Sequence, residues 1–229
     1  MDAVRQRFGE FIDFFRSAVP EAELVLADAI QGTLPDPKQV EAAIITGSPH
    51  SVTQPEPWTH ALADWTRQMV SETRPLLGVC YGHQLMAWAL GGQVEENVLG
   101  YEIGSIEVEL TQEGRTDPLL GVLGESLQVQ STHVDTVTRL PPGAVALGSN
   151  KRALQAFRAG PRAWAVQFHP EFSADIMRTY VELRQPLLRT HCEKRGLNFE
   201  AELARARQVK ETPQGPALLR RFLTLAEQT

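Results

Sequence analysis

The chain has 229 residues, a length that allows one large domain or two small ones. With 42% hydrophobic and 22% charged residues it has the composition of a globular protein, which excludes a coiled coil, a collagen and a wholly disordered chain. The net charge is −6 and no basic block occurs, so a nucleic acid is not an expected partner.

The two cysteines and the N-terminal segment bear on where the protein works. Cys80 and Cys192 are too few for a disulfide framework in a chain of this size, and their sequence contexts differ, so a reducing compartment is expected. The first ten residues carry charges and no cleavage site follows an apolar run, which argues against a signal peptide. The longest apolar runs fall far short of the roughly 20 residues that span a bilayer. We therefore expect a cytoplasmic protein with no membrane partner.

In the first half of the chain, segments with helical periodicity alternate with short apolar runs. Apolar residues at helical spacing predict helices, and apolar runs that end near Gly or Pro predict buried strands. The run PLLGVC at 75–80 is apolar without alternation, which is typical of a strand covered on both faces. The expected helices are 3–18, 58–72 and 81–90, and the expected strands are 24–27, 42–46 and 75–80.

From about residue 98 the pattern changes. Short stretches with alternating apolar and polar residues are separated by Gly, Pro and Asn turns, which is typical of antiparallel or mixed strands. These expected strands are 105–110, 126–130, 144–147, 153–157 and 163–168. After Pro170 we expect helices at 173–194, 198–209 and 214–227. No repeat, linker or composition shift divides the chain, so we expect one domain over 1–229, in which 181–229 form a helical C-terminal extension.

The segment that says most about chemistry is GVCYGHQ at 78–84, where a buried strand is expected to turn into a helix. A G-x-C-x-G pattern at this place favours a nucleophile elbow, because the glycines permit the strained turn that presents the thiol of Cys80. A helix N-terminus favours a thiolate by at most about 2 kcal/mol, whereas lowering a thiol pKa from about 8.5 to about 6 takes about 3.4 kcal/mol. A nearby base is therefore required. A buried core cysteine is the alternative interpretation.

His169 is the best candidate for that base among the histidines. It directly follows the apolar strand expected at 163–168, and α/β proteins place reactive groups at the carboxyl ends of buried strands. Glu171 lies two residues further on, with Pro170 stiffening the chain, so its carboxylate could accept the other ring N–H and fix the tautomer. Cys80, His169 and Glu171 thus form a candidate nucleophile, base and orienting acid. A strand-end histidine beside an exposed glutamate is the alternative.

Three sequence elements, ITGSP at 45–49, GVCYGHQ at 78–84 and QFHPE at 167–171, together closely resemble the class I glutamine amidotransferases of the triad type. The resemblance covers roughly residues 20–180 and extends to stand-alone members related to the glutaminase domain of GMP synthase. It implies an α/β, flavodoxin-like three-layer sandwich with a mixed, mostly parallel central sheet and helices on both faces. It also implies cleavage of the side-chain amide of glutamine, or of a related γ-glutamyl compound, with no cofactor and no metal.

The resemblance further implies roles for individual residues. Cys80 resembles the nucleophile that forms a γ-glutamyl thioester, His169 the general base and acid, and Glu171 the orienting acid. The backbone N–H groups of Gly47 and Tyr81 resemble the two donors of the family's oxyanion hole.

Other residues resemble the family's substrate-binding groups. These are Gln84 and a segment similar to a loop of the S-H-x-D kind, which contains Ser131, Thr132, His133 and Asp135. A hydrogen bond that only stabilises the loop is the alternative for His133 and Asp135. Glu102, in a G-x-E-x-G segment, resembles a residue that frames the pocket, and a purely structural role is its alternative.

Two features depart from the family pattern. An apolar strand usually precedes the first helix and none precedes residue 1, so either the sheet lacks a strand or the recorded start lies downstream of the true one. No ATP-binding loop is found, so ammonia would pass to a synthetase on another polypeptide. A γ-glutamyl peptidase with the same triad and a non-catalytic regulatory relative are the alternative functions. The apolar positions of the C-terminal helices suit either a cap on the domain or a homodimer contact.

Overall fold

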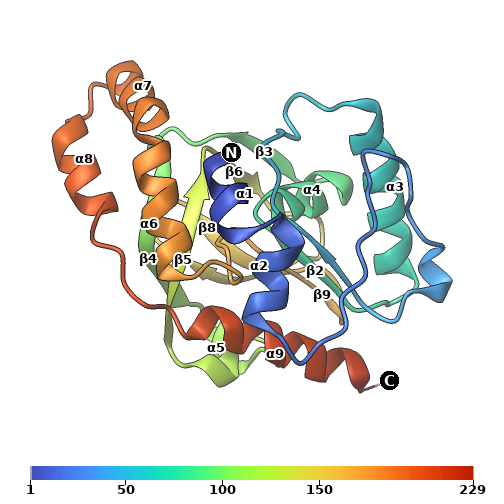
Figure 1. Ribbon diagram of the computed structural model, residues 1–229. Coiled ribbons are helices and arrows are strands. Elements are labelled where there is room, and N and C mark those ends of the chain that lie inside the picture. Colours follow the sequence, from blue (N-terminus) through green and yellow to red (C-terminus); the bar gives the residue numbers. More distant parts are fainter. Residues whose placement is uncertain (1, 229) are drawn as a thin grey trace.

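The computed structural model describes residues 2–228, which form an α/β structure around a curled sheet (Figure 1). The strands are β1 (Ala43–Ile45), β2 (Leu76–Val79), β3 (Gln93–Glu96), β4 (Glu102–Leu110), β5 (Ser126–His133), β6 (Asp135–Arg139), β7 (Val145–Ser149), β8 (Leu154–Arg158) and β9 (Ala163–Val166). The α-helices are α1 (Asp2–Phe8), α2 (Phe11–Ala18), α3 (Pro57–Ser71), α4 (Tyr81–Ala89), α5 (Gln112–Thr116), α6 (Ala174–Leu183), α7 (Gln185–Arg195), α8 (Phe199–Ala206) and α9 (Gln214–Glu227). Short 3-10 helices, η1 (Pro37–Gln39) and η2 (Gly121–Leu123), lie in connections.

The main sheet has seven strands in the order β1-β2-β9-β8-β7-β4-β5, and β3 pairs with β6 in a separate antiparallel ribbon. β1, β2 and β9 run parallel, whereas the pairings from β9 to β5 are antiparallel. The α/β class and the mixed sheet are confirmed, but the parallel part is smaller than expected. The reason is that β7, β8 and β9 follow one another through short turns, and a short turn can join only antiparallel strands.

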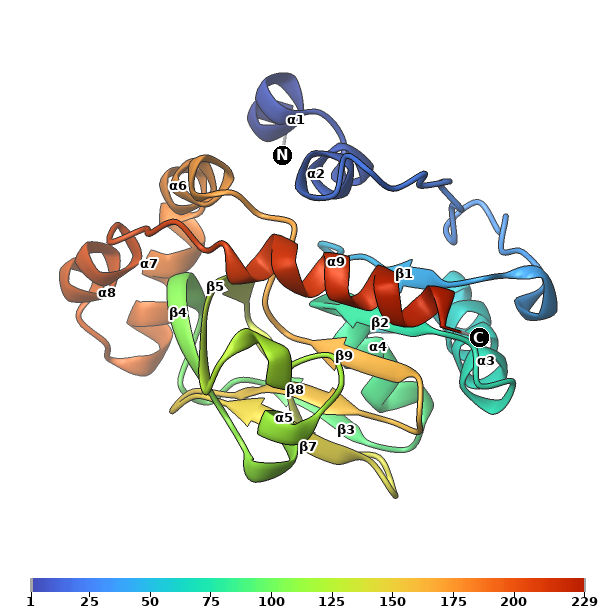
Figure 2. The same ribbon diagram turned by 90° about the horizontal axis from the view of Figure 1, so that it is seen from below.

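Helices cover both faces of the sheet (Figures 1 and 2). β2 is buried along its whole length, and its side chains alternate between two apolar cores. Leu77 and Val79 lie in a cluster with Phe15 of α2 and Phe222 of α9. Leu76 lies in the cluster on the other face, which α3 and α4 cover. The continuous apolar run of this strand therefore reflects burial on both sides, as expected.

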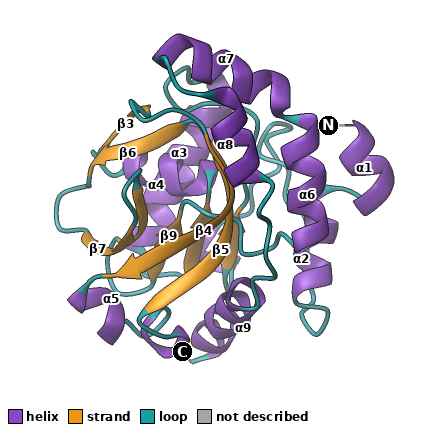
Figure 3. Cartoon of the chain, turned by 90° about the vertical axis from the view of Figure 1, so that its left-hand side faces the viewer, coloured by secondary structure: helices purple, strands orange, loops and turns teal. Residues whose placement is uncertain are grey.

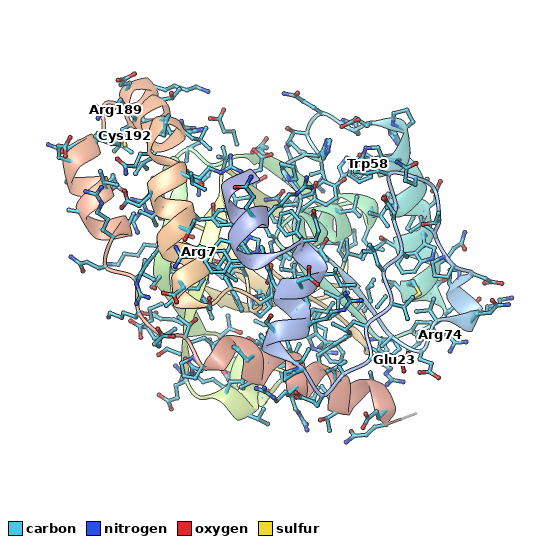
Figure 4. The ribbon with its side chains drawn as sticks, in the orientation of Figure 1. Arg7, Glu23, Trp58, Arg74, Arg189 and Cys192 are labelled. Carbon is cyan, nitrogen blue, oxygen red and sulfur yellow. The ribbon has the colours of Figure 1, made fainter. Side chains whose placement is uncertain are left out.

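α6, α7 and α8 pack together beside β4 (Figure 3), in an apolar cluster that also includes residues of α1 and α2. Arg7 of α1 donates to Thr179 of α6 at 3.4 Å. The guanidinium of Arg189 in α7 lies 3.8 Å from the ring centroid of Phe199 in α8, a cation–π contact between these two helices. Figure 4 labels Arg7 and Arg189. α9 then returns along the sheet, where the Gln214 side chain accepts the N–H of Gln128 at 2.6 Å. In the part of the chain from residue 2 to 228, no helix is long and apolar enough to cross a membrane.

Two expected helices are each divided into two. The helix expected at 3–18 breaks at Gly9, whose φ of +88° is left-handed, and a new helix begins because the Asp13 carboxylate accepts the N–H of Glu10 at 2.9 Å. The helix expected at 173–194 breaks at Arg184, because Pro186 has no N–H to continue the helical hydrogen bonds. The helix expected at 198–209 ends earlier, at Ala206, and the one at 214–227 has the expected bounds.

The strand expected at 24–27 is wrong. These residues form no strand, and Val25 and Leu26 are 87% and 66% exposed. An apolar run predicts a strand only where a neighbouring strand pairs with it, and this segment pairs with none of the strands described between residues 2 and 228.

The segment 131–135, expected to be a loop, is also different in the structure. It contains the end of β5 and the start of β6, with a bend at Val134 between them. β3 and α5 were not expected from the sequence because their residues are largely polar and exposed, so no hydrophobic periodicity marks them.

Candidate active site

The candidate site lies at the carboxyl ends of the three parallel strands. Gly47 follows β1, Cys80 follows β2 and His169 follows β9, and these strands are neighbours in the sheet. Residues far apart in the sequence therefore meet at one edge, because parallel neighbours end on the same side.

Cys80 occupies the sharp turn between β2 and α4. Its φ of 51° and ψ of −97° are a strained combination for a residue with a side chain. The flanking glycines allow the helix to lie directly against the strand: a Cβ on Gly78 would be 2.5 Å from the carbonyl oxygen of Gly82, and one on Gly82 would be 2.3 Å from that of Ile45. The turn predicted from G-x-C-x-G is therefore present, and Cys80 is 8% exposed.

His169 is held from three sides. Its backbone N–H donates to the carbonyl of Gln130 at 2.7 Å, and its ring stacks on Phe172 with centroids 4.2 Å apart. Its Nδ1 donates to the Glu171 carboxylate at 2.7 Å, which leaves Nε2 for chemistry. Glu171 is only 3% exposed, so the interpretation of this residue as an exposed glutamate is wrong.

The electrostatic surroundings favour a charged imidazole at this position. Burial by itself lowers the pKa of His169, but the Glu171 carboxylate and the Cys80 side chain raise it, through charge and hydrogen bonding, to about 10. An imidazolium beside the sulfur can stabilise a thiolate. His169 is thus the nearby base that the sequence analysis required, because a helix N-terminus alone stabilises a thiolate too weakly.

His83, the histidine inside the elbow motif, has a different environment. It is fully buried against Phe157, with ring centroids 4.9 Å apart. Burial, and then the charge of nearby His133, lower the pKa of His83 to about 3. A neutral ring turned into the core is suited to packing rather than to proton transfer.

The two expected oxyanion donors lie next to Cys80. A Cβ built on Gly47 would be 3.6 Å from the Cβ of Cys80, so the loop after β1 touches the elbow. Tyr81 is the first residue of α4, where backbone N–H groups lack an acceptor within the helix. Both N–H groups therefore belong to segments where an oxyanion could be bound.

The expected substrate-binding residues are brought to the same place, with one exception. Gln84, Thr132, His133 and Asp135 line the cavity above Cys80, whereas Ser131 is completely buried on β5 and is not part of its wall. The Cys80 thiol donates to the carbonyl of Thr132 at 3.8 Å. The end of β5 thus borders the sulfur directly.

The cavity has a volume of about 420 Å³, and part of its wall was not predicted from the sequence. Tyr101, in the G-x-E-x-G segment, and residues of the loop after Gly47 also line it. No sequence motif marks the lining residues from α2, the end of β3, α6, α7 and the junction between these two helices: Phe11, Glu96, Tyr180, Arg184, Leu187 and His191. Across residues 2–228, no group of three or more His, Cys, Asp or Glu side chains could hold a metal ion.

Comparison with known proteins identifies the family. The model of the family described as glutamine amidotransferase class-I matches residues 15–182, more than half of the chain. The protein therefore belongs to the class I glutamine amidotransferases, a family whose members are generally enzymes.

Similar curated proteins differ in their activities and lengths. A glutamine amidotransferase-like protein of Schizosaccharomyces pombe is 31% identical over 147 residues, which cover 63% of this chain and 58% of that protein. The γ-glutamyl peptidase 3 of Arabidopsis thaliana is 25% identical over 185 residues, covering 76% and 74%. A GMP synthase of Thermotoga maritima is 34% identical over 137 residues, covering 59% and 25%. The chain thus spans little more than half of the first relative and a quarter of the synthase.

Solved structures share the fold. A glutamine amidotransferase from Thermotoga maritima superposes with a TM-score of 0.69 at 24% identity, covering 97% of this chain and 93% of that one. Another, from Methylobacillus flagellatus, has a TM-score of 0.72 at 22% identity, with coverages of 92% and 88%.

Proposed function

We propose that this protein is a cysteine-dependent hydrolase that cleaves the side-chain amide of glutamine through a thioester at Cys80. The observation that carries the proposal is the meeting of Cys80 and the hydrogen-bonded pair His169–Glu171 at the ends of adjacent parallel strands. A nucleophile, a base and an orienting acid in this relation are sufficient for acyl transfer.

The proposed reaction has two stages. His169 takes the proton of the Cys80 thiol, the sulfur attacks the amide carbon, a C–S bond forms, and the carbonyl electrons move to oxygen, where the N–H groups of Gly47 and Tyr81 stabilise the anion. His169 then donates its proton to the leaving nitrogen, the C–N bond breaks and ammonia departs. Water, deprotonated by His169, then attacks the thioester carbon, the C–S bond breaks and glutamate leaves, and the proton on His169 returns to the sulfur, which restores the cysteine.

Ammonia released here would pass to an acceptor on another polypeptide. The matched GMP synthase of Thermotoga maritima is glutamine-hydrolyzing, and this chain covers only 25% of its length. A separate synthetase that receives ammonia is therefore the partner we propose, and the sequence contains no ATP-binding loop of its own.

A second candidate function is that of a γ-glutamyl peptidase. The supporting observation is the size of the cavity, about 420 Å³, and its extension from Cys80 to Leu187 and His191 of α7. Such a space could hold a leaving group larger than ammonia. The similarity to the Arabidopsis γ-glutamyl peptidase 3 points the same way.

The test measures ammonia from glutamine and amine release from γ-glutamyl dipeptides, with wild-type protein and with Cys80→Ser. We expect turnover in the wild type and none in the variant, together with an adduct on Cys80 after treatment with a diazoketone analogue of glutamine. Cys192→Ser is the matched control, because this buried cysteine lies on α7 and does not line the cavity. Faster release from dipeptides than from glutamine would favour the peptidase. Turnover that persists in Cys80→Ser would overturn the thioester mechanism.

A further inference from the structure

The bend between β5 and β6 connects the reactive centre with a buried ion pair. On one side of the bend, β5 touches the reactive groups through the carbonyls of Gln130 and Thr132, which accept from the His169 N–H and the Cys80 thiol. On the other side, Asp135 lines the cavity. The position of this bend therefore decides where Asp135 stands relative to Cys80.

The buried pair consists of Glu102 on β4 and His133 on β5, which face each other across the two strands. His133 Nε2 and a Glu102 carboxylate oxygen are 3.0 Å apart, and the side chains are 1% and 2% exposed. The carboxylate also accepts from Asn150 at 2.9 Å and from Gln155 at 2.7 Å. Burial by itself raises the pKa of Glu102, but the hydrogen bonds from these three residues and the charge of His133 hold it below its ordinary value.

Both ring nitrogens of His133 face acceptors within the protein. Nε2 faces the Glu102 carboxylate, and Nδ1 lies 2.9 Å from the backbone carbonyl of Asp135. A ring that carries a proton on each nitrogen can donate to both acceptors at once. With both nitrogens engaged, the ring has no donor left for a substrate, although His133 lies along the cavity wall.

Asp135 is in turn fixed by several contacts. Its carbonyl accepts from His133 Nδ1 and from the Gln84 amide, both at 2.9 Å, and its carboxylate accepts from the Ser51 hydroxyl. Gln84 is itself held by the side chain of Gln167 at 3.2 Å. These contacts fix the backbone of Asp135, and its carboxylate is bonded to Ser51, a cavity-lining residue of the loop that follows Gly47.

We propose that Glu102 and His133 are positioning residues: their buried pair holds the Asp135 carbonyl and so fixes the place of the Asp135 carboxylate, which the family resemblance already assigns to the substrate-binding segment. This inference rests on the proposed function. Neither residue of the pair contacts the substrate. Loss of the pair leaves the chemistry at Cys80 intact and weakens the selection of the substrate.

The two nitrogens of His133 can be tested separately. In His133→Asn the amide reaches the position of Nδ1 and keeps the bond to Asp135 but does not reach Glu102, which then has only Asn150 and Gln155 as donors. In His133→Gln the amide reaches the position of Nε2 and keeps the bond to Glu102 but not the one to Asp135.

We expect KM for glutamine to rise about 10-fold in His133→Gln and less in His133→Asn, with kcat within about 3-fold of wild type in both. We expect the reverse order for stability, since His133→Asn removes the imidazole that pairs with the buried Glu102 carboxylate and leaves only Asn150 and Gln155 as its donors. If His133 only stabilised the fold, the variant with the higher KM would also be the less stable of the two.

A labelling experiment provides the second measurement. The rate of Cys80 modification by iodoacetamide, which has no ammonium group, reports the thiolate, whereas the diazoketone analogue of glutamine also reports substrate selection. In Glu102→Gln and His133→Gln we expect the ratio of diazoketone to iodoacetamide rates to fall about 10-fold. The matched control is Asp117→Asn, which removes a buried carboxylate paired with Arg158 and bonded to Trp164, outside the cavity wall. It should lower stability and leave the ratio unchanged.

The outcomes separate the two proposals. If the wild type reacts with the diazoketone and turns over glutamine, but the ratio and KM are unchanged in the variants, the positioning role is overturned and the proposed function stands. If the wild type neither turns over a γ-glutamyl compound nor reacts with the diazoketone, the proposed function fails and this inference fails with it.

Discussion

Gly47 and His169 are so close that a Cβ on the glycine would lie 2.8 Å from Cε1 of the imidazole ring. That separation is below any ordinary carbon–carbon contact, so the loop after β1 and the ring after β9 can coexist only if residue 47 has no side chain. The loop thus supports the histidine sterically, besides offering a backbone N–H to an oxyanion.

We predict that Gly47→Ala lowers kcat by about 100-fold, because the methyl group displaces the imidazole from Cys80 and misplacements of this size cost about that much in rate. The φ of Gly47 is not in the left-handed region, so the backbone itself tolerates alanine. Steady-state kinetics of glutamine hydrolysis check the rate, and thermal unfolding checks the fold. Ser48→Ala, on the same loop, is the control and should keep most of the activity. Equal rates in Gly47→Ala and wild type would show that the loop does not constrain the ring.

Cys80 is strained in the folded state, and this strain has a measurable consequence. Both Cys80→Ala and Cys80→Gly should lack activity, but the glycine variant should have the larger free energy of unfolding, by about 1 kcal/mol, because a residue with a Cβ resists the positive φ of 51°. Urea denaturation of the two variants measures the difference. A less stable glycine variant would indicate that the turn relaxes when the sulfur is absent.

The Glu171–His169 pair should determine the alkaline limit of activity. The pKa of His169 is raised to about 10, so the wild type should keep kcat/KM up to about pH 9 and lose it as the imidazolium deprotonates. In Glu171→Gln the carboxylate that raises the pKa of His169 is gone, and only Cys80 still opposes the lowering of this pKa by burial. The alkaline limb of the pH profile should therefore move to lower pH. Loss of the orienting carboxylate should also reduce kcat by up to about 10⁴-fold. An unmoved alkaline limb would contradict the assignment of Glu171.

The same group links stability to pH. Since the folded pKa of His169 is raised from 6.5 to about 10, the contribution of the pair to stability is fully present below pH 6.5 and is lost as the pH rises toward 10. The free energy of unfolding of the wild type should therefore fall over this range more steeply than that of Glu171→Gln. Denaturation at pH 6, 8 and 9.5 compares them, and parallel curves would mean that the pair is not charged in the folded protein.

The sequence predicted the elements whose signal is local. The apolar run of β2, the glycines around Cys80 and the short spacing from His169 to Glu171 each specify their own geometry. The rest depends on which strands are neighbours. β2 and β9 are adjacent although 83 residues lie between Val79 and Ala163 in the chain. This pairing follows from the topology of the whole sheet, which no local pattern encodes.

The other wall of the cavity could not be predicted for the same reason. Leu187 and His191 lie one turn apart on α7, and their helical spacing says that they share a face but not what that face meets. Likewise, the polar residues of the buried network around Glu102 come from β4, β5 and β8 and from the turn at Asn150. Only the packed structure shows that they satisfy one another.

The mistaken strand at 24–27 leads to a final prediction. Apolar residues usually contribute to stability by burial, but Val25 is 87% exposed, whereas Leu77 in β2 is completely buried. Val25→Ser should therefore change the free energy of unfolding by less than about 0.5 kcal/mol, while Leu77→Ala should reduce it by about 2–5 kcal/mol. Urea denaturation at two protein concentrations measures both variants. A loss above about 1 kcal/mol in Val25→Ser would mean that this segment is covered in solution, and a dependence on concentration would identify a second copy of the chain as the cover.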